Sequence, residues 1–363
     1  MLFAVFAGSY GAYFVYLKLN AGKGWGLKLD PDFSPSVTVL VPAHNEGRVI
    51  QAKLENLAQV SYPREKMEIM LIDDASTDDT LEKAREFVNE HPELPVKILE
   101  QSERKGKAGA LNKGLEVSSY DVVVVTDADC LWPTDILQKA LPYVSDPTVG
   151  ALSGRGVALN SAESWVTRAE KGYLSFMALL RLGESKVHST IRFEGSFCIF
   201  KRKTFDRFDS ESGADDSGTA LRVIQNGYRA IFVPEAYALS EFPDKFTTRT
   251  KVKVRRAVHL TGLWLHCFKL LLTGRLRLPK RIAVPEIFLS IFNPIIFVAL
   301  ACATFVLVVY YPFSLIPLIL GFCLMSLIPK VRSYFVQGIL DQFILFYSIA
   351  LNANKKKIVA WEK

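Results

Sequence analysis

A long uncharged stretch near the carboxyl end of the chain most constrains what it can fold into. No charged residue occurs from Ile287 to Pro329. A helix needs about 20 apolar residues to cross the hydrocarbon core of a bilayer, so this stretch is long enough for two crossings. The sequence Tyr-Tyr-Pro, which begins at Tyr310, fits a turn at the membrane interface between them. Residues 282–330 are therefore predicted to form two transmembrane helices.

Three further segments are apolar enough to associate with a membrane. Residues 1–20 meet their first charge at Lys18 and lack the basic start of a signal peptide, so we interpret them as a transmembrane helix, with a signal peptide as the alternative. Residues 257–281 combine a short amphipathic, interfacial helix with a basic linker. Residues 331–363 contain an interfacial or spanning helix and a basic tail.

Basic residues flank these apolar segments, and all of them fall on one side of the bilayer if three helices span it. They are Lys18, Lys23, Arg275, Arg277, Lys280, Arg281, Lys330, Arg332, Lys355, Lys356 and Lys357. The positive-inside rule then places the domain between the helices in the cytoplasm. The net charge of +7 is thus explained by the membrane surface. A nucleic-acid partner is not expected, because the basic run Lys251–Arg256 lacks interleaved aromatic residues.

The domain between the helices, residues 36–256, alternates β-branched runs with segments of helical periodicity. Strands are expected at 36–43, 67–74, 96–100 and 121–129, and helices at 48–59, 78–90 and 107–117. This alternation predicts an α/β fold with a Rossmann-like, mostly parallel sheet that binds ligands at the carboxyl ends of its strands. No GxGxxG follows the first strand, which argues against an NAD-binding domain. The segment Gly154–Asn160 is interpreted as a turn.

Acidic motifs follow two of the predicted strands. Asp127 and Asp129 flank Ala128, and a spacing of two puts both carboxylates on one side of an extended chain. Such a pair can hold Mg²⁺ or Mn²⁺ together with substrate phosphates, although Asp-x-Asp is also common in turns. Asp74 ends another strand, where it can bind a nucleoside or cap the following helix.

A lysine and a second acidic pair complete the candidate residues. Lys107 lies at the expected amino end of a helix, which favours an anionic phosphate, and a solvated basic loop is the alternative. Asp215 and Asp216 precede a helix expected at 219–226. One of them can cap this helix, and the other can stay ionised at its positive end and accept a proton.

The order of the motifs is more informative than any single motif. The segments PAHNE, IDDASTDDT, GKAGALNKG, TDADC, EGSFCIFKR and GADDSGTALRVIQNGYRAIFVPEA follow one another between residues 42 and 236. This series resembles family 2 glycosyltransferases, and more narrowly the membrane-bound branch with cellulose, hyaluronan and poly-N-acetylglucosamine synthases. Its first half is also similar to dolichyl-phosphate mannose synthases. The resemblance covers residues 36–256 and implies a GT-A fold and an inverting transfer from a nucleotide-activated sugar.

The resemblance also implies a role for each matching residue. Donor binding, from the nucleoside to the diphosphate, falls to Ala43, Glu46, Asp74, Lys107, Asp127 and Arg256. The divalent metal, Mg²⁺ or Mn²⁺, is held by Asp127 and Asp129. The acceptor is bordered by Glu194, Gly195 and Ser196. Asp216 is the implied catalytic base.

One segment departs from the polymerising members of this branch. They carry Gln-x-x-Arg-Trp after the acidic helix, and the counterpart here is KVRRA. Arg256 is retained, but Lys253 replaces Gln and Ala257 replaces the Trp on which an acceptor sugar stacks. We therefore expect a non-processive transfer of a hexose, with mannose favoured, from a GDP- or UDP-sugar to a polyprenyl- or dolichyl-linked acceptor. A processive polysaccharide synthase that polymerises UDP-sugars is the alternative.

The sequence favours an integral membrane enzyme with a cytoplasmic catalytic domain over two other classes of membrane protein. A non-enzymatic scaffold with a degenerate sugar-nucleotide domain is disfavoured, because Asp127, Asp129 and Asp216 are retained. A small transporter is disfavoured because ionisable residues within spans mark transport pathways, and residues 287–329 have none.

Overall fold

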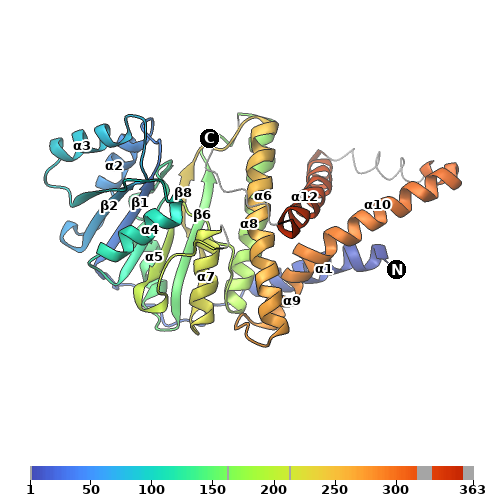
Figure 1. Cartoon of the computed structure of the whole chain (residues 1–363). Helices are drawn as coiled ribbons and strands as arrows, with labels where there is room; N and C mark the ends of the chain where they lie inside the picture. Colours follow the sequence, from blue (N-terminus) through green and yellow to red (C-terminus); the bar gives the residue numbers. More distant parts are fainter. Residues whose placement is uncertain (1, 162, 212–213, 317–328, 355–363) are drawn as a thin grey trace. The chain divides into compact units, whose positions relative to one another are not determined.

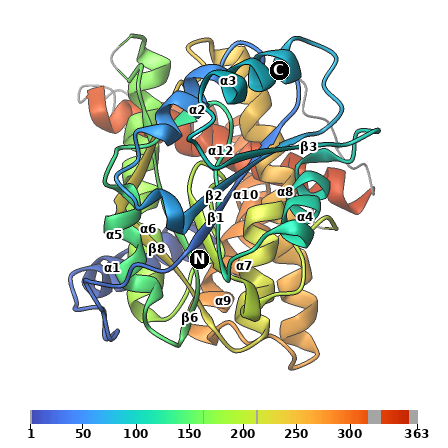
Figure 2. The ribbon, with the colours of Figure 1, turned by 90° about the vertical axis from the view of Figure 1, so that its left-hand side faces the viewer.

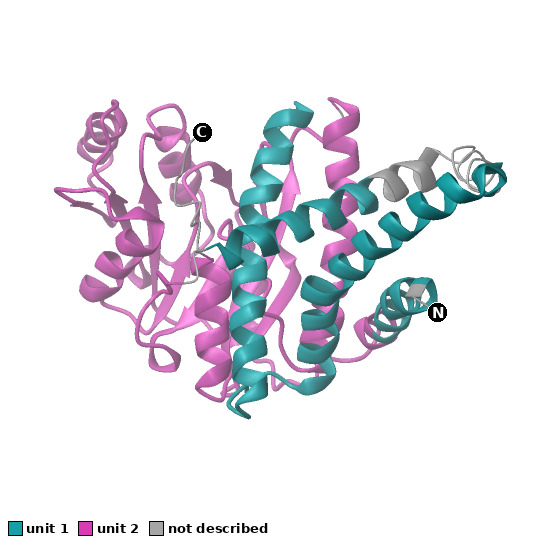
Figure 3. Ribbon diagram, turned by 45° about the vertical axis from the view of Figure 1, so that its right-hand side comes forward, with its two compact units in different colours: residues 1–16, 243–360 teal, residues 17–242, 361–363 magenta. Residues whose placement is uncertain are grey.

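The computed structural model describes residues 2–161, 163–211, 214–316 and 329–354. The chain divides into two compact units, which Figure 3 colours separately. The described residues between 17 and 242 form one unit, here called the sheet unit. The described residues of 2–16 and 243–354 form the other, here called the helical unit.

Within the described residues, the sheet unit contains an eight-stranded sheet of order β3-β2-β1-β4-β7-β6-β8-β5. Its strands are β1 (Val37–Ala43), β2 (Met67–Asp73), β3 (Val96–Glu100), β4 (Val122–Val125), β5 (Cys130–Leu131), β6 (Val149–Ala158), β7 (Cys198–Lys201) and β8 (Arg229–Ser240). The first four are parallel, β6 and β8 are parallel to each other, and β7 runs antiparallel between β4 and β6. The mostly parallel α/β sheet predicted from the sequence is confirmed.

Helices cover both faces of this sheet, as Figures 1 and 2 show. They are α2 (Ile50–Ala58), α3 (Thr80–Glu90), α4 (Gly106–Val117), α5 (Ile136–Val144), α6 (Trp165–Val187) and α7 (Asp215–Gln225). Apolar side chains of α2, α3 and α5 share a core with alternate residues of β1, among them Val39 and Val41. On the other face, Gly114 of α4 lies against Leu40 and Ile72. Burial on both faces explains why these strands are continuous apolar runs.

The predicted strands and helices of the first half match these elements closely, with one correction. The strand expected at 121–129 ends at Val125, where its pairing with β1 and β7 also ends. Asp127 and Asp129 therefore lie in a turn that leads into β5, and the extended spacing assumed for them is wrong.

The turn expected at Gly154–Asn160 is also wrong, because residues up to Ala158 belong to β6. The glycines there serve close packing. A Cβ atom on Gly154 would lie 2.4 Å from the carbonyl oxygen of Ala236, and one on Gly156 would lie 2.7 Å from Oε2 of Glu194. Glycine within a strand often marks such a close approach.

The described residues of the helical unit are mainly helical. The helices are α1 (Leu2–Ala21, to Tyr16 in this unit), α8 (Phe246–Leu272), α9 (Lys280–Ile287), a π-helical turn (Phe288–Phe292), α10 (Asn293–Tyr310) and α12 (Pro329–Ala353). Among the described residues, one continuous helix, Lys280–Tyr310, is long and apolar enough to cross a membrane. The second predicted crossing falls largely on residues 317–328, outside the described residues. Of the predicted helix 1–20, residues 2–20 are helical, and its insertion into a membrane stays a prediction.

Polar contacts join α8 to α12 inside the helical unit. Nζ of Lys253 lies 2.9 Å from Oδ1 of Asp341, and Arg249 donates to Gln337 at 2.7 Å. The boundary predicted at residue 256 falls inside α8, while the compact sheet unit ends at Phe242. The basic and apolar halves of this segment form one continuous helix, so the change in composition does not mark a break in the fold.

Candidate active site

A single buried lysine meets three carboxylates at the carboxyl edge of the parallel strands. The Nζ atom of Lys107 lies 2.9 Å from Oδ1 of Asp127 and 3.1 Å from Oδ2 of Asp216. Oδ2 of Asp215 is 3.6 Å away. The side chain of Lys107 is only 8% exposed. The structure thus brings together three of the predicted site residues, Lys107, Asp127 and Asp216, and adds Asp215.

Three separate segments bring these side chains together. Lys107 lies in the first turn of α4, Asp127 follows β4, and the acidic pair lies in the first turn of α7. Gly195 backs the cluster, since its carbonyl accepts a hydrogen bond from the backbone N–H of Asp127. A Cβ atom on Gly195 would lie 2.1 Å from Nζ of Lys107 and 2.8 Å from Oδ2 of Asp216. Any side chain there would displace the cluster.

Neither carboxylate of the acidic pair caps α7, so the capping alternative is wrong. The helix begins at Asp215, earlier than expected, and Ala214 occupies the cap position without a side-chain hydrogen bond. Asp215 and Asp216 are instead inside the first turn, where the helix dipole favours negative charge. Their side chains are therefore available to the cluster.

The net effect of burial and the neighbouring charges is to raise the pKa values of both Asp216 and Lys107. Burial raises the pKa of Asp216 to about 7, with Asp215 and Asp127 acting in the same direction and the Lys107 ammonium opposing them. Burial alone would lower the pKa of Lys107, but the attraction of its three carboxylates raises it well above the ordinary value. At neutral pH the lysine is charged, and Asp216 is poised between its two protonation states.

The cluster has the oxygen ligands and the excess negative charge that suit a divalent cation. Three carboxylates face one ammonium, and Oδ1 of Asp216 and Oδ2 of Asp215 are buried without a hydrogen bond. In the described part of the chain, no three His, Cys, Asp or Glu side chains converge into a complete metal site. Asp129 is exposed in the turn after the half-buried Asp127. Such a partial oxygen set fits Mg²⁺ or Mn²⁺ completed by substrate phosphates.

The carboxylate of Asp74 is occupied by protein donors. It accepts hydrogen bonds from the backbone N–H groups of Lys105 and Gly106 at 2.7 and 2.8 Å, and from the side chain of Gln101 at 3.0 Å. Asp74 thus binds the amino end of α4. The alternative prediction was that Asp74 caps the helix that follows it, which is α3. Asp74 instead accepts from backbone N–H groups at the start of α4.

The other residues expected at the nucleoside lie at and just after the carboxyl end of β1. Ala43 is the last residue of that strand and pairs with Asp73. Glu46 is buried, and its backbone N–H donates to Oγ1 of Thr80 at 2.7 Å. Nearby Asn45 adopts a positive φ of 56°. Their roles in donor binding stay predictions.

The segment Glu194–Ser196 is anchored by residues that the sequence did not indicate. Nη1 of Arg181 lies 2.5 Å from Oε1 of Glu194, whose Oε2 accepts the N–H of Gly156. The carbonyl of Ser196 accepts the indole N–H of Trp132 at 2.9 Å. Arg181 is buried in the middle of α6, and no motif surrounds it. By contrast, the sequence could have indicated that Lys53 of α2 is buried, because this lysine shares a helical face with apolar residues.

Arg256 lies on α8 in the helical unit and is exposed. Its expected contact with the donor diphosphate stays a prediction.

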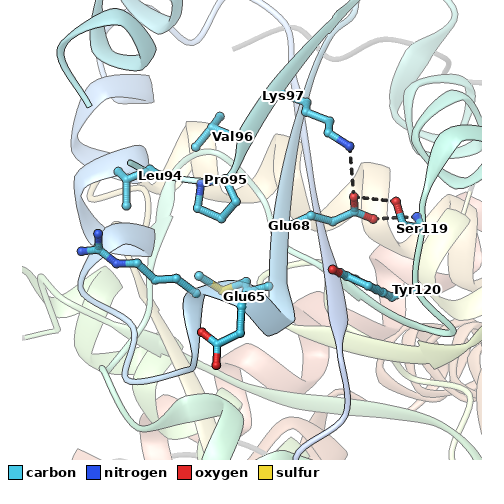
Figure 4. A pocket seen from close by; sticks show the side chains of 10 residues that line it. Glu65, Glu68, Leu94, Pro95, Val96, Lys97, Ser119 and Tyr120 are labelled. Carbon is cyan, nitrogen blue, oxygen red and sulfur yellow. Dashed lines mark hydrogen bonds and ion pairs between the residues drawn. The ribbon is translucent and has the colours of Figure 1, made fainter. Parts of the chain in front are cut away.

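A surface hollow of about 410 Å³ lies at the opposite, amino ends of the strands (Figure 4). Its main polar feature is Glu68, which is buried and accepts from the N–H of Ser119 at 2.6 Å, the hydroxyl of Ser119 at 2.9 Å and Thr38 at 2.5 Å. Lys97 adds an ion pair at 3.4 Å. This carboxylate is fully engaged with the protein, and it ties the amino ends of β1, β3 and β4 to its own strand, β2.

The fold and the family comparison agree on the class. The sequence pattern of glycosyl transferase family 2 matches residues 38–209. A mannosyltransferase from Pyrobaculum calidifontis, PcManGT, in complex with GDP-Man and Mn²⁺ superimposes with a TM-score of 0.83 at 32% identity, over 98% of this chain and 97% of that one. The structure is therefore the GT-A fold of a nucleotide-sugar-dependent glycosyltransferase. The chain belongs to glycosyl transferase family 2.

Two curated relatives match over parts of their length. A beta-monoglucosyldiacylglycerol synthase from Synechocystis sp. is 36% identical over 38% of this chain and 28% of its own. A poly-beta-1,6-N-acetyl-D-glucosamine synthase from Staphylococcus aureus is 26% identical over 67% of this chain and 60% of its own. The matched segments thus span less than two thirds of either relative.

Proposed function

We propose that the protein is an inverting, metal-dependent membrane hexosyltransferase that moves mannose from a nucleotide sugar to a polyprenyl- or dolichyl-linked acceptor, one sugar at a time. The observation that carries the proposal is the cluster of Lys107 with Asp127 and Asp216 at the carboxyl edge of the sheet. Support for mannose comes from the likeness over nearly the whole chain to a mannosyltransferase bound to GDP-Man and Mn²⁺.

In this reaction Asp216 is the base. An acceptor hydroxyl attacks the anomeric carbon from the face opposite the diphosphate, a new C–O bond forms, and the bond to the diphosphate oxygen breaks. Asp216 takes the proton that the hydroxyl loses. A base with a pKa of about 7 suits this step, because it is ionised near neutral pH and still basic enough to hold a proton.

Lys107 is assigned to the leaving diphosphate. Its ammonium is held by three carboxylates and remains charged, so it can stabilise the negative charge that develops on the leaving diphosphate. Asp127 and Asp129 would hold Mg²⁺ or Mn²⁺, which would neutralise the same developing charge. Gly195 has no side chain, so Lys107 and Asp216 can lie against the backbone of the segment expected at the acceptor.

A lipid-linked acceptor and a membrane location are supported by the apolar helix Lys280–Tyr310 and by the likeness to a synthase of a diacylglycerol glycolipid. The non-processive mode is supported by α8. Ala257 is buried there and offers no aromatic platform, and Lys253 pairs with Asp341. A processive polysaccharide synthase is the second candidate, because the poly-N-acetylglucosamine synthase matches two thirds of the chain.

A donor panel tests the proposal. The full chain in lipid nanodiscs is incubated with Mn²⁺, total lipid extract and one labelled donor at a time: GDP-mannose, GDP-glucose, UDP-glucose or UDP-N-acetylglucosamine. We expect label from GDP-mannose in the organic phase as a lipid with one or few sugars, and none with Asp216→Asn. Labelled polymer from a UDP-sugar would favour the second candidate. Failure of every donor to release a nucleoside diphosphate would refute both.

A further inference from the structure

A fully buried lysine lies directly behind the acidic turn. Lys53 is on α2 and is 0% exposed. It shares the inner face of that helix with Ile50, Leu54 and Leu57, all of which are apolar. Burying an ammonium among apolar side chains is costly unless it finds polar partners. The identity of those partners therefore indicates what the lysine does.

All of the partners belong to the segment that contains the acidic turn. The Nζ atom of Lys53 donates to Oγ1 of Thr126 at 2.6 Å and to the carbonyl oxygen of Cys130 at 2.8 Å. It also lies 4.7 Å from the centre of the Trp132 ring, within range of a cation–π contact. One ammonium thus bridges the residue before Asp127 and the residue after Asp129.

The same segment is tied to the residues expected at the acceptor. The carbonyl oxygen of Ser196 accepts from the indole N–H of Trp132 at 2.9 Å and from Oγ1 of Thr126 at 3.2 Å. The thiol of Cys130 lies 3.3 Å from that oxygen. A shift of the turn would therefore move the backbone on which Gly195 faces Lys107.

We propose that Lys53 is a positioning residue, which clamps the turn Asp127–Asp129 from inside the protein so that its carboxylates keep the geometry that binds a metal–diphosphate group. The inference rests on the proposed function and extends it to a residue that does not touch the substrate. Stability alone does not account for this lysine, because an apolar side chain of similar volume in place of a buried charge is often neutral or stabilising. Supporting groups behind metal ligands commonly change metal affinity by about 10- to 100-fold.

The test compares two buried lysines of the sheet unit. Lys201 is also buried and donates to a backbone carbonyl, that of Asp146, at 2.8 Å. It pairs with Val122 at the other end of β4, far along the strand from the turn. Lys201→Met is therefore the matched control for Lys53→Met, which removes the ammonium and keeps the length of the side chain.

Calorimetric titration of the full chain with GDP and with UDP, at several Mn²⁺ concentrations, measures the effect. For Lys53→Met we expect a Kd for the nucleoside diphosphate about tenfold weaker than that of the wild type, and a higher Mn²⁺ concentration at half saturation. Lys201→Met should bind like the wild type, whatever its melting temperature. Thr126→Val removes one partner of Lys53 and should weaken binding about threefold in the same direction, which keeps the test open if Lys53→Met does not fold.

The inference would be overturned if Lys53→Met kept the wild-type Kd and Mn²⁺ dependence, because loss of a purely structural lysine would change only the melting temperature. If Lys53→Met does not fold, the same result in Thr126→Val would overturn it. Equal weakening in Lys53→Met and Lys201→Met would overturn it as well. If the wild type itself binds neither nucleotide with Mn²⁺, the proposed function fails and the inference falls with it, so the two failures are distinguishable.

Discussion

The two ends of the same parallel strands hold buried carboxylates in opposite situations. At the amino ends, Glu68 is surrounded by donors from Thr38, Ser119 and Lys97. At the carboxyl ends, Asp216 shares one ammonium with two other carboxylates and keeps a buried oxygen without a hydrogen bond. Figure 4 shows the contacts of Glu68 with Lys97 and Ser119.

The pKa values record this difference. Burial alone would raise the pKa of Glu68, but its hydrogen bonds and Lys97 outweigh burial and lower it. The pKa of Asp216 is raised because burial and like charge outweigh its one lysine. Where donors outnumber carboxylates, the group stabilises the fold. Where carboxylates outnumber donors, the uncompensated negative charge is available to a ligand, and such sites are where function is expected.

The largest effect is expected from Asp216→Asn. The amide cannot accept the proton of the acceptor hydroxyl, so kcat/KM for donor consumption should fall by about a thousandfold. Glu68→Gln is the matched control, because it makes the same chemical change at the other strand end and should leave kcat/KM unchanged. Turnover of Asp216→Asn at the wild-type rate would show that the base is another group.

The second largest effect is expected from Lys107→Met, which should lower kcat/KM by about a hundredfold. The variant removes the positive charge at the leaving diphosphate and leaves three carboxylates without their ammonium. Steady-state kinetics with varied donor concentration measures it. Lys105→Met, an exposed lysine two residues away, is the control and should keep wild-type kinetics. Equal losses in both variants would contradict a special role for Lys107.

A smaller, graded effect is expected from pH. The base works only when ionised, so kcat/KM should decline about tenfold for each pH unit below the pKa of Asp216, which is about 7, and level off above it. The pH profile of donor consumption at constant Mn²⁺ measures this. A profile that stays flat from pH 5 to about 8 would argue against a base with a raised pKa.

Substitution of Glu68 is expected to leave activity unchanged and to lower stability. A Glu68→Gln protein should lose about 1–3 kcal/mol of unfolding free energy, because an amide cannot accept all the bonds of the carboxylate. The pKa of Glu68 is lowered by folding, so its contribution is present above the unfolded pKa and is lost as pH falls through the folded one. Denaturant unfolding of both proteins at pH 7 and pH 3 checks this, since their difference should shrink at the lower pH.

The order of the motifs singled out three residues that the fold brings together, but local geometry was harder to predict. Lys107, Asp127 and Asp216 were singled out from the sequence and do meet. The extended conformation expected for Asp127 and Asp129 was wrong, because β4 ends where its neighbours stop pairing. Arg181 carried no signal, since a buried arginine in a helix looks like an exposed one. Lys53 did carry one, through its place on the apolar face of α2.

The sequence by itself determined the alternation of strands and helices, the family and the long uncharged stretch, because these follow from short-range periodicity and from motifs in order. Only the tertiary structure decided which carboxylates are satisfied and which are not. The partners of Glu68 and Asp216 come from other strands and helices, such as Ser119 for the former and Lys107 for the latter. The balance of buried charge is therefore a property of the packing of distant segments.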